Sequence, residues 1–188
     1  MRGLEPIVEW LARAGVSPDA ITLAGIPVGV IAGGCLLLSP TMPPLLLAVP
    51  LLAALRLVLN LLDGALARRT GNIHPRGELY NELGDRLADI AFLAPVAFLP
   101  GANQATVLLG VLGAVFASVA GLAPRAAGGE RLYRGILSKP GRMVLLSVFA
   151  VVVLIAGPEA WGPFGPLLLA GTVLTAIERI VVGVRRLA

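Results

Sequence analysis

Long apolar stretches constrain this chain more than any other feature of its sequence. Six of them, separated by short polar or Pro/Gly-rich breaks, span residues 21–38, 45–66, 79–99, 105–123, 143–156 and 164–184. A membrane-crossing helix needs about 20 predominantly apolar residues, and the fifth stretch needs flanking residues to complete a span. Charged residues make up only 14% of the chain, against roughly a quarter in soluble domains. We therefore predict an all-α, polytopic membrane protein with six transmembrane helices in a single domain over residues 1–188.

The basic residues predict how this protein is oriented in the membrane. If the N-terminus is cytoplasmic, the outward breaks are residues 39–44, 100–104 and 157–163, and none of them contains Lys or Arg. All 15 Lys and Arg residues then fall on the inner side or in the inner halves of the adjoining helices. This is the positive-inside pattern, so both termini are predicted to be cytoplasmic. Topology thus accounts for the basic residues, and we predict no nucleic-acid partner.

A short amphipathic segment, within residues 1–16, precedes the first apolar stretch. Ile7, Trp10 and Leu11 share one face of a helix over these residues, which favours a helix lying in the membrane interface. A solvated surface helix would have the same pattern. Trp10 and Trp161 both fall near predicted interfaces, where tryptophan commonly anchors a helix.

Polar side chains gather where the second and third predicted helices meet their connecting loop. Helical spacing gives each helix one polar face, with Asn60, Asp63 and Ala67 on the first and Asn81, Asp85 and Asp89 on the second. The two helices are antiparallel neighbours, so their polar faces can meet near the inner interface. Charged groups inside a membrane are costly and mark functional sites, although a structural polar network between the helices would use similar residues.

Oxygen ligands on facing helices predict a site for a hard divalent cation. Magnesium characteristically uses few carboxylates and completes its coordination with substrate phosphates. Gly64, beside Asp63, would let a phosphate approach the backbone closely.

The spacing of these residues resembles one family in particular. From Asn60 to Asp85 the chain reads N-x2-D-G-x2-A-R-x8-G-x3-N-x3-D. This resembles the CDP-alcohol phosphotransferase motif D-x2-D-G-x2-A-R-x8-G-x3-D-x3-D, with every spacing preserved. The segment that begins at Pro18 and ends at Thr22 also resembles the Pro-Asn-x-x-Thr start of that family's first helix, with Asp19 in place of Asn. Six helices with both ends cytoplasmic is likewise the architecture of the family.

The resemblance implies an enzyme of phospholipid biosynthesis. A CDP-linked lipid, usually CDP-diacylglycerol, would bind with its pyrophosphate on one or two Mg²⁺ or Mn²⁺ ions, a hydroxyl acceptor would attack, and CMP would leave. Asp85 matches the proposed general base. The metal positions of the motif fall on Asn60, Asp63, Asn81 and Asp85. The implied substrate-binding residues are Thr22, Gly64, Ala67, Arg68 and Gly77. The family also tends to dimerise, so a homodimer is compatible with the resemblance.

Two departures from the motif affect the predicted metal site. Asn60 and Asn81 stand where the family has aspartate, which lowers the charge of the four positions from −4 to −2. An amide oxygen is neutral and binds a dication more weakly than a carboxylate does, so a single ion is favoured over two. Glu78 and Glu82 lie close enough in the sequence to offer a replacement carboxylate. An alternative register would use Asp85 and Asp89 as the last pair, but it loses the match at the glycine position.

A second basic group lies between the fourth and fifth stretches, and it comprises Arg125, Arg131, Arg134, Lys139 and Arg142. Of these, Arg125, Lys139 and Arg142 are candidates for binding a phosphorylated acceptor, such as glycerol 3-phosphate or inositol phosphate. The positive-inside pattern alone would also place basic residues here, and both interpretations stay open. Glycerol 3-phosphate is the default expectation. His74, in the preceding basic loop, is assigned no role.

Two other classes of function are compatible with the sequence. The Asn substitutions suggest a catalytically silent relative that binds a lipid or a partner. Asp63, Asp85 and Asp89 could instead form the ion relay of a transporter, although the strict motif spacing favours the enzyme.

Overall fold

Each of the six apolar stretches contributes most of one long helix in the computed structural model, which describes residues 4–72 and 74–187. No strand occurs among these residues, so the all-α prediction is confirmed. The elements are α1 Glu5–Arg13, α2 Pro18–Leu38, η1 Pro43–Leu47, α3 Ala48–Thr70, α4 Pro75–Leu93, η2 Ala94–Phe98, α5 Gln104–Ala126, α6 Lys139–Ala156, η3 Pro158–Trp161 and α7 Phe164–Leu187, where η marks a 3₁₀ helix.

Local sequence explains where the helices around the site begin and end. Helix α2 starts at Pro18, directly after Ser17, whose hydroxyl accepts a backbone N–H of the first turn. Helix α4 starts in the same way at Pro75, after His74, whose Nδ1 accepts a backbone N–H at 2.9 Å. Proline fits the first helical position because the missing N–H has no partner there. Helix α3 ends at Thr70 and is capped by Gly71, which adopts the left-handed conformation with φ of 67° that favours glycine. His74 therefore caps a helix, a role that the sequence did not reveal.

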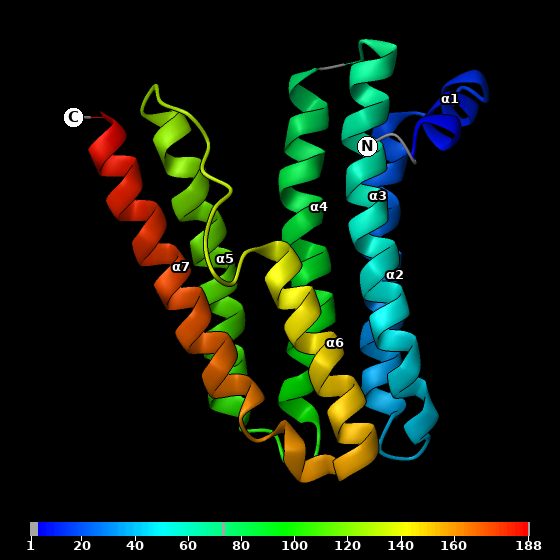
Figure 1. The fold of residues 1–188 in the computed structure, drawn as a ribbon, viewed down its shortest axis with the longest axis vertical. Coiled ribbons are helices and arrows are strands. Elements are labelled where there is room, and N and C mark those ends of the chain that lie inside the picture. The colour runs from blue at the N-terminus through cyan, green and yellow to red at the C-terminus, as the bar shows by residue number, and fades with distance from the viewer. Residues whose placement is uncertain (1–3, 73, 188) are drawn as a thin grey trace.

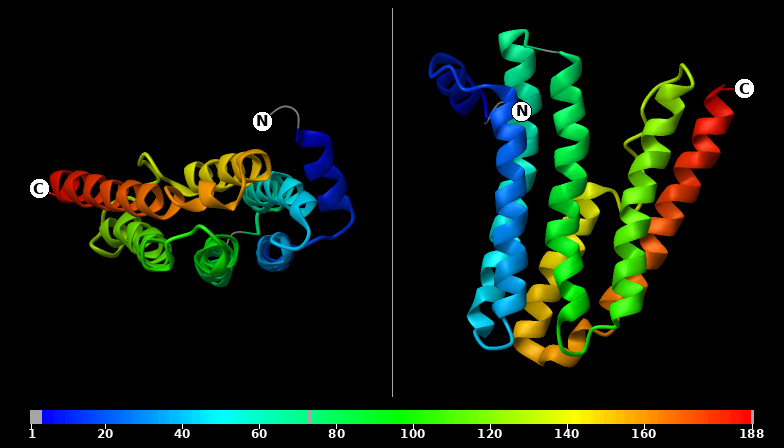
Figure 2. Two further views of the ribbon diagram at one scale, coloured as in Figure 1. Left: turned by 90° about the horizontal axis from the view of Figure 1, so that it is seen from below. Right: turned by 180° about the vertical axis from the view of Figure 1, so that it is seen from behind.

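The long helices run side by side in two groups (Figure 1), with α2, α3, α4 and α6 in one group and α5 and α7 in the other. Helix α2 packs against both α3 and α4, α6 packs against α3, and α5 pairs with α7. The view from behind shows α4 standing between α2 and the α5–α7 pair (Figure 2). The loop of residues 127–138 descends from the upper end of α5, so α6 begins about halfway down the bundle (Figure 1). The space above the start of α6 is therefore bounded by helices on several sides.

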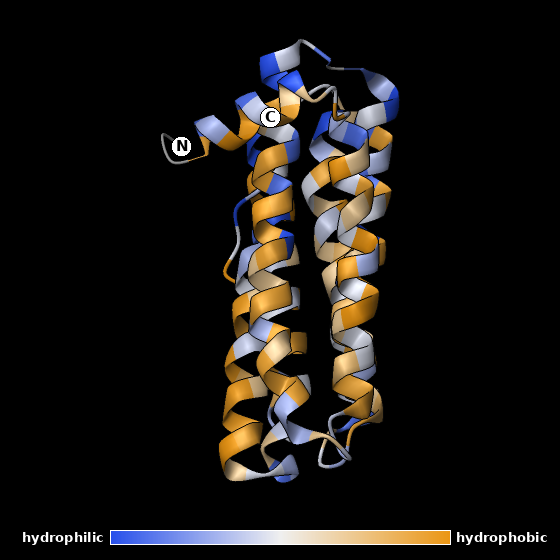
Figure 3. Ribbon diagram, turned by 90° about the vertical axis from the view of Figure 1, so that its right-hand side faces the viewer, coloured by the Kyte–Doolittle hydropathy of each residue, from blue (hydrophilic) through white to orange (hydrophobic). Residues whose placement is uncertain are grey.

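Both ends of the described chain lie at the same end of the bundle as the α3–α4 connection (Figure 1). Hydrophilic residues gather at this end, and apolar residues dominate the rest of the helices (Figure 3). The opposite end is closed by an aromatic cluster in which the Trp161 ring lies 6.3 Å from that of Phe149 and 5.5 Å from that of Phe164. Trp161 is 1% exposed, so it is a core residue and the prediction of an interfacial anchor is wrong for it. Trp10 on α1 is 66% exposed.

Five helical segments among the described residues are long and apolar enough to cross a membrane. They are Pro18–Leu38, Pro43–Thr70, Gln104–Ala126, Lys139–Ala156 and Pro158–Leu187. Large apolar side chains on these segments face outward, as Leu51 at 72% and Ile155 at 81% exposure illustrate, because lipid rather than water would surround them. Helix α4 is outside this set because it carries charged residues along its length, so the count of six remains a prediction.

Close helix packing provides a first testable prediction. A Cβ added to Gly33 of α2 would lie 2.6 Å from the backbone oxygen of Ala91 on α4, whereas a Cβ on the neighbouring Gly34 would meet nothing within 4 Å. Gly33→Ala must therefore push α2 away from α4, and we expect a loss of about 1–3 kcal/mol in stability. The apparent unfolding midpoint in detergent should fall for Gly33→Ala and stay level or rise for Gly34→Ala. Equal shifts for the two variants would contradict this packing.

Candidate active site

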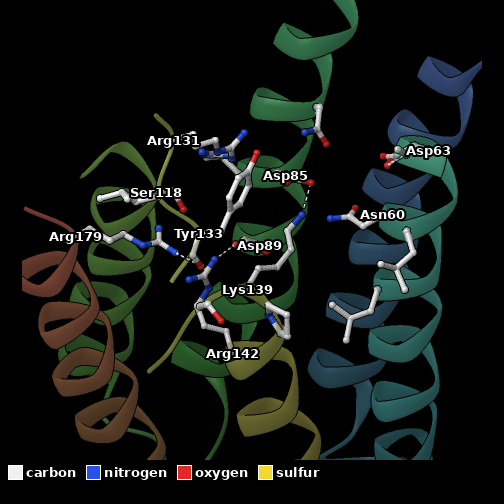
Figure 4. A pocket seen from close by; sticks show the side chains of 18 residues that line it. Asn60, Asp63, Asp85, Asp89, Ser118, Arg131, Tyr133, Lys139, Arg142 and Arg179 are labelled. Carbon is white, nitrogen blue, oxygen red and sulfur yellow. Dashed lines mark hydrogen bonds and ion pairs between the residues drawn. The ribbon is translucent and has the colours of Figure 1, made fainter. Parts of the chain in front are cut away.

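A cavity of about 650 Å³ lies above the start of α6, between the two helix groups (Figure 4). Its walls come from α3, α4, α5, α6, α7 and the loop of residues 127–138. Three carboxylates line it, from Asp63, Asp85 and Asp89. Five cationic side chains line it as well, from Arg86, Arg131, Lys139, Arg142 and Arg179. Positive charge is thus in excess, and the cavity is suited to an anionic ligand.

Asp63 supplies the one lining carboxylate that makes no ion pair with a described residue. It is 8% exposed. Its Oδ2 accepts a hydrogen bond of 2.8 Å from the Thr22 hydroxyl of α2, and its Oδ1 accepts one of 2.6 Å from the Gly64 N–H. These neutral donors hold the carboxylate in place and leave its charge available for a cationic ligand.

Asp85 on α4, in contrast, is already paired with two cations. Its Oδ1 contacts Arg56 Nη2 at 2.5 Å and also contacts Lys139 Nζ. Arg56 donates as well to Asn60 Oδ1, one turn further along α3. Figure 4 shows Lys139 reaching from α6 towards Asp85, and Asp63 facing the cavity from α3. Arg56 and Lys139 therefore connect three helices through one carboxylate oxygen.

Asp89 lies one helical turn beyond Asp85 and is held by Arg142 of α6. Its Oδ2 accepts from Arg142 Nη2 at 2.5 Å, and Arg142 Nη1 donates to the Leu137 carbonyl at 3.0 Å. Asp89 Oδ1 and Arg142 Nε are buried without a hydrogen-bond partner among the described residues. Both side chains line the cavity, so two polar atoms without a partner lie just behind its surface.

The two glutamates of α4 that could replace a missing carboxylate are bound by arginines instead. Glu82 pairs with Arg86, one turn away, and with Arg131 of the descending loop. Glu78 pairs with Arg125 at the end of α5. Neither Glu78 nor Glu82 lines this cavity.

Arg179 of α7 ties the descending loop to the bundle. It donates to the backbone oxygens of Ala117, Tyr133 and Arg134 at 2.6, 3.2 and 2.7 Å. These bonds hold Tyr133, whose ring lies 4.7 Å below the Arg131 guanidinium, over the cavity (Figure 4). Arg179 was not among the predicted site residues, although an arginine within an apolar stretch is a signal that could have revealed it. Ser118 and Tyr133 were not predicted either, and the sequence carries no such signal for them.

A second cavity, of about 480 Å³, adjoins the first towards the end that carries the chain ends. Asp63, Gly64 and Asn81 line both cavities. Four more predicted site residues line only the second, namely Thr22, Ala67, Gly77 and Arg125. A Cβ on Gly77 would lie 2.9 Å from Asp19 Oδ1, so α4 approaches the start of α2 closely at this glycine.

The remaining predicted residues also divide between cavities. Asn60, Asp85, Lys139 and Arg142 line the first cavity only. Arg68 lines neither, and lies in a groove between α1 and α3 with Arg69. Apart from this arginine, the motif residues of α3 and α4 thus line one or both of the two cavities.

Among the motif residues, Asp63 offers the donor atoms best suited to a divalent ion. No group of three or more His, Cys, Asp or Glu side chains able to hold a metal occurs in the described part of the chain. Asp63 offers a carboxylate free of ion pairs, and the Asn81 amide lines the same cavities, which suits a hard cation that takes its other ligands from phosphates. Asp85 and Asn60 are already occupied by Arg56 and Lys139.

The chain is similar in sequence to known bacterial proteins. No protein-family model matches the chain. The chain is 33% identical to the inner membrane protein YnbA of Escherichia coli K12, over 81% of this chain and 75% of that protein. It is 30% identical to the phosphatidylinositol phosphate synthase of Mycolicibacterium smegmatis, over 93% of this chain and 81% of the synthase.

A solved structure has the same fold. The Mycobacterium tuberculosis phosphatidylinositol phosphate synthase PgsA1, in complex with manganese and citrate, superposes with a TM-score of 0.77 at 23% identity, covering 95% of this chain and 87% of the synthase. The same synthase with CDP-DAG bound gives a TM-score of 0.69 at 24% identity, covering 100% and 92%. The fold, the extent of the match to the Mycolicibacterium enzyme and the spacing of the motif lead to one conclusion: the chain belongs to the CDP-alcohol phosphatidyltransferase family.

Proposed function

We propose that this protein transfers a phosphatidyl group from a CDP-linked lipid, such as CDP-diacylglycerol, to the hydroxyl of a phosphorylated polyol, and that it releases CMP. The observation that carries the proposal is the pair of adjoining cavities that share Asp63, Gly64 and Asn81. One cavity provides room for a nucleotide beside the motif glycines, and the other is lined by an excess of cations. Family membership and the CDP-DAG complex of PgsA1 support the donor.

The donor is assigned to the second cavity and the shared wall. Gly64 and Gly77 would admit the nucleotide close to the backbone, with Thr22, Ala67 and Arg125 around it. Asp63 and Asn81 would hold one Mg²⁺ or Mn²⁺ ion, a choice supported by the manganese complex of PgsA1. When bound, the ion supplies charge neutralisation on the pyrophosphate.

The chain's own residues would manage the proton and the geometry of the reaction. The acceptor oxygen attacks the phosphorus that carries the lipid, the bond from that phosphorus to CMP breaks, and the acceptor proton is lost. Asp85 is the proposed general base, because it lines the acceptor cavity and both of its cations contact Oδ1. Oδ2 has no hydrogen bond among the described residues, which leaves it to receive the proton.

The first cavity, of about 650 Å³, favours an acceptor that carries a phosphate. Lys139, Arg142 and the first turn of α6 face this cavity together, and a helix N-terminus attracts anions in its own right. Glycerol 3-phosphate, the default expectation, finds no support among the relatives, which are inositol phosphate enzymes where their names state a product. We therefore propose an inositol phosphate or a related phosphorylated polyol.

A substitution at Arg142 tests the acceptor assignment. Arg142→Gln removes a guanidinium whose charge-assisted hydrogen bonds are worth about 1.5–3 kcal/mol, so the KM for the phosphorylated acceptor should rise about 10–100-fold. The KM for CDP-diacylglycerol should change little in the same assay of CMP release. Arg134→Gln, at an exposed arginine paired with Glu178, is the matched control. An equal rise in both KM values would contradict the assignment.

Thr22 is assigned the role of positioning the metal ligand Asp63. Thr22→Val removes the hydroxyl that donates to Asp63 Oδ2, and loss of such a supporting bond weakens metal binding by about 10–100-fold. Electron paramagnetic resonance of free Mn²⁺ during a titration measures the affinity. Thr41→Val, at an exposed hydroxyl bonded only to the Leu38 carbonyl, should leave it unchanged. Unaltered affinity in Thr22→Val would remove this role.

The membrane arrangement is also a proposal. We infer six spans, with α4 as the sixth, because its 19 residues give about 28 Å of helix and α2, a candidate span, packs along it. Asp85, Arg86 and Asp89 face the first cavity, and Glu78 and Glu82 pair with arginines rather than face lipid. Both termini and the cavities would lie at the cytoplasmic face, since the basic residues gather there. The chain would form one membrane-embedded domain.

One experiment decides between this function and its alternatives. Purified protein in nanodiscs is incubated with CDP-diacylglycerol, Mg²⁺ and a panel of acceptors that includes inositol phosphate, glycerol 3-phosphate and free inositol. CMP release is quantified and the lipid formed is identified by mass spectrometry. The proposal predicts release only with phosphorylated acceptors, and most strongly with inositol phosphate. Absence of turnover with every acceptor, while CDP-diacylglycerol still binds, would instead establish a silent relative.

A further inference from the structure

We propose that Arg56 and Lys139 act as built-in site cations that take the place of a second metal ion, so that this active site works with a single divalent ion. The inference rests on the proposed function and deepens it, because it concerns the same cavity. It would account for Asn60 and Asn81, the two departures from the family motif. With fewer carboxylates the site would hold one ion, and the two side-chain cations would neutralise the phosphate charge that a second ion neutralises.

Arg56 is positioned as a fixed part of the site. Its residue is 1% exposed, and its guanidinium bridges Asn60 Oδ1 on its own helix and Asp85 Oδ1 on α4. The neighbouring helix makes room for it at Gly25, where an added Cβ would lie 2.8 Å from the guanidinium carbon. Arg56 is thus packed against a glycine of α2 and bonded to side chains of α3 and α4. These contacts hold the guanidinium in one place, so it is not a mobile counterion.

Lys139 approaches the same carboxylate oxygen from the opposite side of the cavity. It is the first residue of α6, its side chain is 16% exposed, and Nζ contacts Asp85 Oδ1. A cation at a helix N-terminus is repelled by the helix dipole, so this location carries an electrostatic cost that other positions on α6 would avoid. Its ammonium has three donors, and Asp85 is its only ion-pair partner among the described residues. Nζ itself is buried, so this ammonium is a fixed charge in the wall of the cavity.

These two cations occupy oxygen atoms that a second metal ion would need. The Asn60 amide oxygen already accepts from Arg56, and Asp85 Oδ1 contacts both site cations. The four motif positions carry two carboxylates, and Arg56 and Lys139 supply two positive charges beside them. A second dication would have to displace buried guanidinium and ammonium groups, whereas Asp63 has no such competitor. Charge on the acceptor side of the reaction is therefore neutralised by fixed groups of the chain.

The number of Mn²⁺ ions bound per chain tests this inference directly. Wild-type protein in nanodiscs with CDP-diacylglycerol is titrated with Mn²⁺, and free Mn²⁺ is followed by electron paramagnetic resonance. We expect one ion per chain, and any other number would overturn the inference. A four-site variant, R56L/K139Q/N60D/N81D, restores the carboxylates and removes the site cations, so it should bind two ions. A folded four-site variant that binds one ion would contradict the inference.

A milder variant keeps the inference testable if the four-site variant does not fold. Lys139→Gln retains the Arg56–Asp85 pair but removes one repulsive charge from the vicinity of the bound ion, so Mn²⁺ affinity should rise about tenfold. Transfer should slow at least 100-fold, and Lys139→Arg should restore most of it. A lysine that only stabilised the fold would not raise metal affinity when removed, so an unchanged or weaker affinity would overturn the inference. Arg134→Gln should bind Mn²⁺ as the wild type does.

Ion counting separates this inference from the proposed function, because it requires no turnover. A wild-type protein that binds one Mn²⁺ but releases no CMP with any acceptor would remove the proposed transferase function and leave the ion count intact. A protein that releases CMP while binding two Mn²⁺ ions would retain the function and eliminate the role of the site cations.

Discussion

Replacement of Asp85 by Asn is expected to slow CMP release from CDP-diacylglycerol by about 10³-fold, within the range that a positioned general base contributes. The amide keeps the shape of the side chain but cannot accept the acceptor proton. It also leaves Arg56, which is 1% exposed, without its carboxylate partner. Binding of CDP-diacylglycerol should persist, because the nucleotide is assigned to the adjoining cavity, which Asp85 does not line.

The matched control for this prediction is Glu178→Gln, which neutralises a carboxylate of α7 paired with the exposed Arg134. It should retain wild-type turnover. Initial rates at saturating acceptor give the comparison, and thermal unfolding midpoints verify that both variants are folded. Full activity in Asp85→Asn would show that the proton leaves by another route and that Asp85 has no catalytic role.

The second large effect is expected at Asp63. Asp63→Asn removes the one carboxylate in the cavity that is free of ion pairs with described residues, and with it the proposed anchor of the metal ion. Only neutral amide oxygens and the already paired Asp85 remain at the motif positions. We expect Mn²⁺ affinity to fall at least 100-fold, and transfer to fall by about 10³-fold or more, since loss of the ion removes several kcal/mol of charge stabilisation.

Glu130→Gln provides the control, because this residue's side chain is 88% exposed and only loosely paired with Arg186. Mn²⁺ titrations and CMP-release rates on the same preparations separate loss of the ion from loss of the fold. An Asp63→Asn variant that binds Mn²⁺ with unchanged affinity would place the metal elsewhere.

Hydropathy predicted the helices well because lipid imposes a simple requirement on length and polarity. The stretch 21–38, for example, became α2 at Pro18–Leu38, and 164–184 became α7 at Phe164–Leu187. The short stretch 143–156 was extended back to Lys139, as a complete span required. Apolar content could not show that the preceding loop descends into the bundle, because that path depends on the bonds from Arg179 to loop carbonyls.

Motif spacing placed the carboxylates of α3 and α4 on facing surfaces, and the structure brings Asp63 and Asp85 to one cavity. The sequence could not show which cations pair with these carboxylates. Whether Asp85 meets a metal or a lysine depends on how α6 is placed, and Lys139 comes 54 positions later in the chain. Trp161 was misplaced for a similar reason, since only the tertiary packing of Phe149 and Phe164 shows that it is buried.

The measurement that tests the whole account most directly is the location of Mn²⁺ by anomalous scattering in crystals grown with CDP-diacylglycerol. We predict one anomalous peak per chain, in contact with the Asp63 carboxylate, with the pyrophosphate of the donor beside it and the nucleotide between α2, α3 and α4. A map with no peak at Asp63, or with the nucleotide bound away from the α3 and α4 motif residues, would contradict the account.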